Sequence, residues 1–163
     1  MNKPLVSLSL LLFASGCSSS PVGRWEGELE EVCVSETEHI DGGSYKMTSC
    51  LTNTEIDMEL GDNHKGSADW ATDLVFEVTN CSWDSSCYDV FYGDLLMDGD
   101  AEVTESGDGW ELVLDMKGGM SIDMAGELYS EWVEFVEIFD CAIGGDLMEC
   151  ESAELGGLLF RRK

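Results

Sequence analysis

The chain has 163 residues, of which 34 are acidic and 8 are basic, so its formal net charge is −26 at pH 7. This length allows one domain with a hydrophobic core. The acidity excludes a nucleic-acid binder, which needs clustered Lys and Arg, and it excludes a basic helix lying on an anionic membrane. With 44% hydrophobic residues, the chain is too apolar to be a disordered acidic tail.

The first residues are typical of an export signal. Lys3 supplies a positive charge, and residues 5–14 are apolar apart from two serines. This stretch is too short to span a bilayer as a mature helix, but it has the length of a secretory hydrophobic region.

A second signal follows the apolar stretch. The run Phe13-Ala14-Ser15-Gly16-Cys17 resembles the lipobox of bacterial lipoproteins. The resemblance implies cleavage before Cys17 and acylation of that cysteine, and Ser18 in place of an aspartate implies sorting to the outer membrane. We therefore expect a lipid-anchored envelope protein that faces the periplasm or the cell surface. Its expected parts are a signal peptide at 1–16, a lipidated tether at 17–22 and a single domain at 23–163.

The other six cysteines indicate three disulfides, because an even number in an exported chain is typical of oxidised pairs. Hairpins centred on Asp41-Gly42 and on Gly145-Asp146 each place two cysteines opposite one another. Both pairs fall on non-hydrogen-bonded positions, where the strands lie closest. Thiolate ligation of a metal is disfavoured, since no Cys-x-x-Cys spacing occurs. The predicted disulfides are Cys33–Cys50, Cys81–Cys87 and Cys141–Cys150.

Apolar and polar residues alternate in four segments, a pattern that predicts half-buried strands. The apolar faces are Ile56, Met58 and Leu60; Trp70, Leu74, Phe76 and Val78; Trp110, Leu112, Leu114 and Met116; and Met120, Ile122, Met124 and Leu128.

Turn residues between these faces predict the register, since opposite residues must point the same way. A three-residue loop at 117–119, with Gly119 left-handed, is one of these turns. The result is an all-β antiparallel meander of about eight strands. It closes most economically as a small barrel, because closure removes exposed edges, and a β-sandwich is the alternative. The predicted opposite pairs are Leu60 with Ala68, Val103 with Trp110, and Met116 with Met120.

Residues 131–140 allow two interpretations. Their apolar positions fit one face of a helix, which would make the fold α+β. Their Trp, Val, Phe and Ile content favours a strand, and the hairpin at Gly145-Asp146 needs one leading into it. A strand here would be apolar on both faces, so its outer face would need a cover. An exposed patch at 132–139 would indicate a protein partner.

The start of the domain supplies another resemblance. Gly23-Arg24-Trp25 is similar to the Gly-x-Trp motif that opens the first strand of lipocalin-like barrels, and Arg161 or Arg162 could cover that tryptophan. The resemblance implies a carrier of a small apolar ligand; the alternative is a packed interior. The residues expected to line a cavity are Trp25, Trp70, Trp110, Met58, Met116, Met120 and Met124.

No catalytic motif is present, and both histidines stand beside turn residues, so we expect neither catalysis nor a cofactor. Calcium is the metal that the acidic residues best suit, with Asp98, Asp100 and Glu102 as candidates, although a solvated acidic rim is the simpler interpretation.

Antiparallel pairing of the first and last strands would bring the tether and the basic C-terminus to one end. Arg24, Arg161, Arg162 and Lys163 are then expected to face the anchor and to dock on anionic headgroups. The leading interpretation is a lipid-anchored β-barrel that acts as a binding or interaction module, without catalysis. The alternatives are a carrier of a small apolar ligand, and a calcium-dependent adhesin or a carboxylate enzyme.

Overall fold

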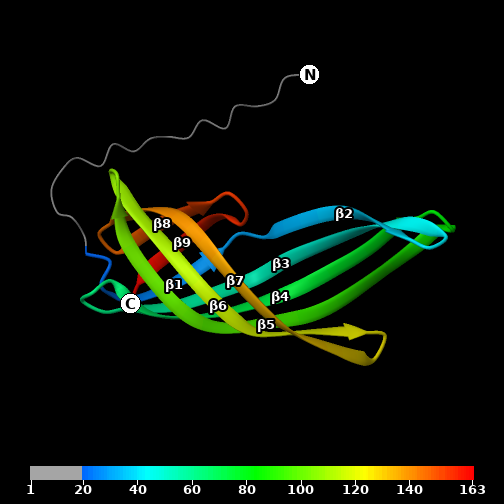
Figure 1. Ribbon diagram of the computed structural model, residues 1–163, viewed down its shortest axis with the longest axis horizontal. Coiled ribbons are helices and arrows are strands. Elements are labelled where there is room, and N and C mark those ends of the chain that lie inside the picture. The colour runs from blue at the N-terminus through cyan, green and yellow to red at the C-terminus, as the bar shows by residue number, and fades with distance from the viewer. Residues whose placement is uncertain (1–19) are drawn as a thin grey trace, which may run out of the picture.

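The computed structural model describes residues 20–163, so Cys17 and the predicted signal peptide lie outside the described residues. All regular elements of the described part are strands (Figure 1). It follows that no helix among residues 20–163 is long and apolar enough to cross a bilayer. The strands are β1 (Gly23–Leu29), β2 (Val32–Ile40), β3 (Gly43–Leu60), β4 (Lys65–Cys81), β5 (Asp84–Ser106), β6 (Gly109–Met124), β7 (Glu127–Gly144), β8 (Leu147–Ser152) and β9 (Gly156–Arg162).

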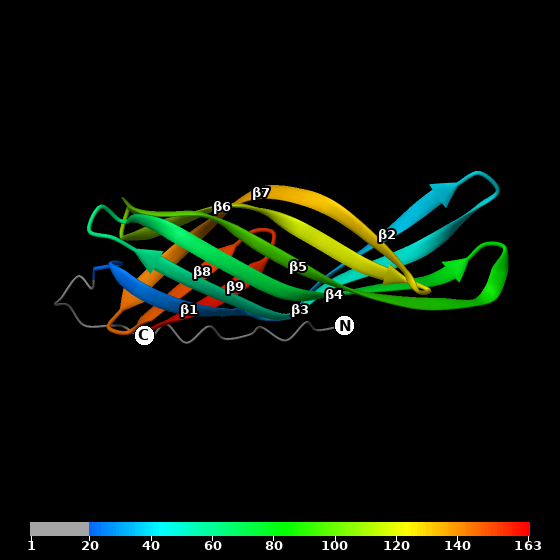
Figure 2. The same ribbon diagram turned by 90° about the horizontal axis from the view of Figure 1, so that it is seen from below.

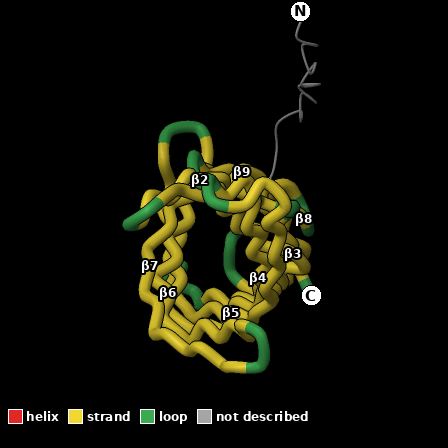
Figure 3. Tube along the Cα trace, turned by 90° about the vertical axis from the view of Figure 1, so that its right-hand side faces the viewer, coloured by secondary structure: helices red, strands yellow, loops and turns green. Residues whose placement is uncertain are grey.

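The strands form one antiparallel sheet in the order β1-β9-β8-β7-β6-β5-β4-β3-β2. Because β1 also pairs with β3, the hydrogen bonds close into a ring (Figure 3). The predicted antiparallel meander is confirmed, with nine strands where about eight were expected, and its closure is barrel-like. The sandwich alternative is wrong, since a second sheet is absent from the described residues.

The ring is closed along only part of its length. β1, β8 and β9 are short, whereas β3 to β7 are long, so three hairpins extend beyond the closed ring (Figure 2). In this open half, the described strands β2 and β7 form the two edges. β2 pairs with β3 alone, and β7 pairs with β8 only over residues 140–144.

The closed ring encloses the hydrophobic core. Alternate residues of the strands that form the ring point inward, and the most buried side chains come from strands far apart in sequence. Trp25 of β1, Met116 of β6, Phe139 of β7 and Phe160 of β9 are each fully buried. Gly27 makes room for Phe160, whose ring lies against the position that a Cβ on Gly27 would occupy.

The apolar alternation therefore predicted the inward faces correctly in three of the four segments. In the fourth segment the prediction is wrong for Leu128, which lies opposite Asp123 and faces outward. The two-residue turn Ala125-Gly126 is the reason, since it makes the inward positions even-numbered in β6 and odd-numbered in β7.

Residues 131–140 lie within β7, which confirms the strand interpretation and excludes the helix there. The strand is stabilised by packing of its inward residues Phe135 and Phe139 against the interior, while Val136 and Ile138 face outward.

The expected loop at 117–119 is wrong. β6 continues through it, and Met116 lies opposite Gly99 of β5 and Phe135 of β7 rather than opposite Met120. Glycine is needed at position 118 because a Cβ there would overlap the backbone of β5 at the carbonyl oxygen of Leu96.

The other two register predictions miss by two residues, which leaves every side chain on its predicted face. The turn after β5 is centred on Gly107-Asp108, where Gly107 has φ +59°, and the turn after β3 is lengthened by His64 at φ +60°. The observed pairs are Val103 with Leu112, and Leu60 with Gly66.

All three predicted disulfides are present, namely Cys33–Cys50, Cys81–Cys87 and Cys141–Cys150. The first and last join directly opposite residues whose Cα atoms lie 4.1 Å apart, as expected for closely spaced strands.

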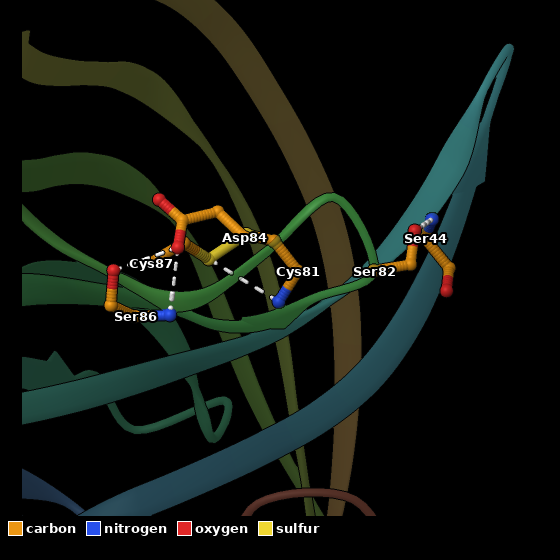
Figure 4. Close-up of a disulfide and its surroundings, with 6 residues drawn as sticks. All are labelled: Ser44, Cys81, Ser82, Asp84, Ser86 and Cys87. Atoms are coloured by element: carbon orange, nitrogen blue, oxygen red, sulfur yellow. Dashed lines mark hydrogen bonds between the residues drawn. A yellow bond between two sulfur atoms is a disulfide. The ribbon is translucent and has the colours of Figure 1, made fainter.

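The disulfide between Cys81 and Cys87 staples the tip of the β4–β5 hairpin (Figure 4). Ser82 ties this tip to β3: its backbone N–H donates to the carbonyl of Ser44 at 2.8 Å, and its hydroxyl accepts from the Ser44 N–H at 2.9 Å. Inside the loop, hydrogen bonds from the hydroxyl and backbone N–H of Ser86 lower the pKa of Asp84.

Candidate functional site

The outer face of β7 carries a row of exposed apolar side chains. Leu128 is 73% exposed, Trp132 62%, Val136 59% and Ile138 54%. These residues lie at even positions of one strand, so they share its outward face. We call this set the β7 stripe. An apolar row of this kind on an otherwise acidic chain is the feature that most needs a partner.

Beside the β7 stripe, the backbone of β7 is unpaired. Among residues 20–163, β8 covers β7 only at residues 140–144, so residues 127–139 have a ladder partner, β6, on one side alone. An unpaired strand edge offers N–H and C=O groups to any extended chain that comes alongside.

The inward face of β7 is acidic where the ring is open. Glu127 and Glu131 are exposed, and Glu131 accepts a hydrogen bond of 3.4 Å from the hydroxyl of Tyr129. Glu137 lies deeper, within the ring, and is 8% exposed. Residues 127–139 include no Lys or Arg.

The predicted cavity residues divide between the two halves of the molecule. Trp25, Met58, Trp70 and Met116 are buried together in the core of the closed ring. Trp110 and Met120 are half-buried. Met124 is 44% exposed beside the turn after β6 and lies outside the buried core, so its place in a cavity lining stays a prediction.

Clefts described by the structure lie on the outer surface. One of about 320 Å³ is lined mainly by outward side chains of β3, β4 and β5, and one of about 420 Å³ lies where β1 leaves β3. Neither of these two clefts is lined by Trp25 or Trp110.

The contact expected between a C-terminal arginine and the first tryptophan is present. The guanidinium carbon of Arg162 lies 4.5 Å from the ring centroid of Trp25, a cation–π geometry. The indole N–H of Trp25 donates to the carbonyl of Pro21 at 2.7 Å, and Arg162 donates to the carbonyls of Val22 and Ser20 at 3.1 and 2.6 Å. These bonds fasten the described end of the tether to the ring.

Strand pairing brings the start of β1 and the C-terminus to one end, with Trp25 opposite Arg162. Acids neutralise much of the positive charge there. Lys163 binds Glu26 and Asp57, each at 3.0 Å, and these hydrogen bonds raise the pKa of Lys163. The other ion pairs are Arg24–Glu59 at 3.9 Å and Arg162–Asp146 at 4.0 Å, whereas Arg161 is exposed. Docking of this cluster on headgroups stays a prediction, which these pairs do not favour.

The calcium candidates do not converge. Asp98, Asp100 and Glu102 alternate along the outer face of β5, and Glu102 is paired with Lys65 at 2.8 Å. Within the described residues, a metal-sized cluster forms only around Glu31, Cys33 and Cys50, whose sulfurs are consumed by a disulfide. Calcium binding stays a prediction without a gathered site.

Sequence reasoning found the outward apolar residues of 132–139 but missed the free edge beside them. The feature that indicates this free edge is the short length of β8, which ends at Ser152 before it can cover the rest of β7.

A comparison with family models, curated proteins and solved structures finds no match to this chain.

Proposed function

We propose that this protein is a lipid-anchored binding module of the bacterial envelope, and that the outward face of β7 binds a protein partner. The observation that carries the proposal is the β7 stripe, whose four apolar side chains are each more than half exposed. Catalysis has no part in the proposal.

A protein partner fits the β7 stripe better than a bilayer does. Glu134 lies within the stripe, where its carboxylate accepts a 3.2 Å bond from the indole N–H of Trp132. Asp115 of β6 stands directly opposite Val136. These acids would be repelled by an anionic membrane surface, whereas a protein can offer them matched donors.

The packed ring supports a binding module over a ligand carrier. A carrier needs interior space, but Trp25, Phe139 and Phe160, three large inward side chains of the ring, have no exposed surface. The lipocalin-like carrier remains the second candidate on the strength of the Arg162–Trp25 contact.

The lipid anchor can be tested at Cys17. In the native host, we expect the wild-type protein to fractionate with outer membranes and the Cys17→Ser variant to appear in the soluble envelope fraction. Substitution of the neighbouring Ser19→Ala is the matched control and should leave the protein membrane-bound. If Cys17→Ser stays in the membrane fraction, the anchor assignment is wrong.

The partner can be tested by photo-crosslinking in living cells. A photoreactive phenylalanine analogue in place of Ile138 should yield one discrete protein adduct, identified by mass spectrometry and lost when Val136→Asp is added. The same analogue in place of Glu28, an exposed position of β1, is the control and should not yield that adduct. Adducts to lipid alone at position 138, or the same adduct from both positions, would refute the proposal.

A further inference from the structure

We infer that β7 binds its partner by strand addition, and that the added strand is amphipathic, with apolar residues on one face and Lys or Arg on the other. This inference rests on the proposed function and specifies how the β7 stripe is used. The partner segment would extend the open half of the sheet at its β7 edge, beside residues 128–138.

The backbone of β7 offers a regular set of unpaired groups. In an antiparallel ladder, residues whose N–H and C=O groups bond to one neighbouring strand alternate with residues whose N–H and C=O groups point to the opposite side. The two-residue turn Ala125-Gly126 makes Met124 and Glu127 the closing hydrogen-bonded pair, so odd-numbered residues of β7 bond to β6. The N–H and C=O groups of the even-numbered residues therefore point away from β6. Asp140 is the last of them that β8 covers, so the even-numbered residues 128–138 have unpaired N–H and C=O groups within the described residues.

The same residues carry the apolar row. Leu128, Trp132, Val136 and Ile138 are even-numbered, so exposed side chains and unpaired backbone groups belong to one set of positions. A strand that bonds to this edge automatically lays its own outward side chains beside the β7 stripe. Apolar residues are therefore expected on that face of the partner.

The inward face of β7 favours an added strand with positively charged side chains. In the open half, its exposed odd-numbered residues include Glu127 and Glu131, and residues 127–139 have no Lys or Arg. An added strand would place its inward side chains beside these carboxylates, where Lys or Arg would be attracted and Asp or Glu repelled. Alternation of apolar and basic residues is the pattern that satisfies both faces at once.

Charge also disfavours a second copy of this chain as the occupant. The other free edge of the described residues, β2, carries Glu36 and Glu38 and has no Lys or Arg in Val32–Ile40. Pairing β2 with β7, or β7 with itself, would bring acids together in a molecule whose net charge is already −26. A segment of another, basic protein is the occupant that the edge fits.

The test uses the full chain purified in detergent and three labelled peptides, each long enough to span residues 128–138. One alternates Lys with Val, one has the same composition with its lysines in one block, and one alternates Glu with Val. Fluorescence anisotropy at low salt measures binding. We expect the alternating Lys-Val peptide to bind at least about tenfold more tightly than the other two, and to slow amide exchange at the even-numbered residues of β7.

Proline variants separate strand addition from general attraction to an acidic protein. Val136→Pro removes an unpaired N–H while leaving the bonds to β6 intact, and an edge position tolerates proline. Val136→Pro should weaken binding of the alternating Lys-Val peptide about tenfold. Ser130→Pro provides a second variant of the same edge. Thr37→Pro, on the free edge of β2, is the matched control and should bind as the wild type does.

The outcomes distinguish this inference from the proposed function. Equal binding by Val136→Pro, Ser130→Pro and the wild type, or equal binding of the blocked and alternating lysine peptides, would overturn strand addition. The crosslink from position 138 would then still stand as evidence for a partner. Conversely, edge binding of the peptide without any crosslinked protein in cells would support strand addition and refute the proposed function alone.

Discussion

Gly118→Ala is expected to lower the free energy of unfolding by about 3 kcal/mol or more, among the largest effects for a single added methyl group. A Cβ at Gly118 would lie 2.6 Å from the Cα of Met97 and closer still to the carbonyl oxygen of Leu96. Both atoms belong to the backbone of β5, so no side-chain rotation can relieve the overlap. The β5–β6 ladder would have to separate, which opens the ring at its middle.

The neighbouring glycine provides the control. Gly119 faces outward, has nothing within 4 Å of its Cβ position and does not have a positive φ. Gly119→Ala should therefore change stability by no more than about 0.5 kcal/mol. Equilibrium urea unfolding of the oxidised protein, followed by tryptophan fluorescence and circular dichroism, measures both variants. Similar destabilisation by the two substitutions would contradict the close approach of β5 and β6.

Trp25→Ala is expected to cost about 3–5 kcal/mol of unfolding free energy. Trp25 is fully buried at the seam where β1 joins β9 and β3, so its loss leaves a cavity next to the strands that close the ring. It also leaves the carbonyl of Pro21 without its indole donor and Arg162 without its aromatic partner.

Urea unfolding of Trp132→Ala is the comparison, because Trp132 is equally large but mostly exposed. The Trp132→Ala variant should lose about 0.5 kcal/mol or less of unfolding free energy, and it should abolish the crosslink from position 138.

A double-mutant cycle of Trp25→Phe with Arg162→Gln should give a coupling free energy of about 0.5–1 kcal/mol. Zero coupling would mean that the cation–π contact contributes nothing to closure.

These two variants also indicate why the sequence analysis was right about most side-chain faces and wrong about the turn expected at 117–119. Trp25 lies inside because apolar alternation has a period of two, which is a local property of each strand. Lys117-Gly118-Gly119 has the composition of a turn, and nothing local reveals that Gly118 is needed for the approach of β5. A glycine in a turn and a glycine at a close contact have the same appearance in sequence.

The sequence by itself determined the strand character of the domain, most of the residues that face inward and all three disulfide pairs. Alternation fixes the faces, and two-residue turns fix the registers that bring Cys33 to Cys50 and Cys141 to Cys150. Only the tertiary structure decided the other registers, because a slip of two residues leaves every side chain on the same face. It also decided that the ring closes at one end and that β7 keeps a free edge. The physical reason is that an edge depends on where a neighbouring strand ends, and β8 ends at Ser152 without any signal in the sequence of β7.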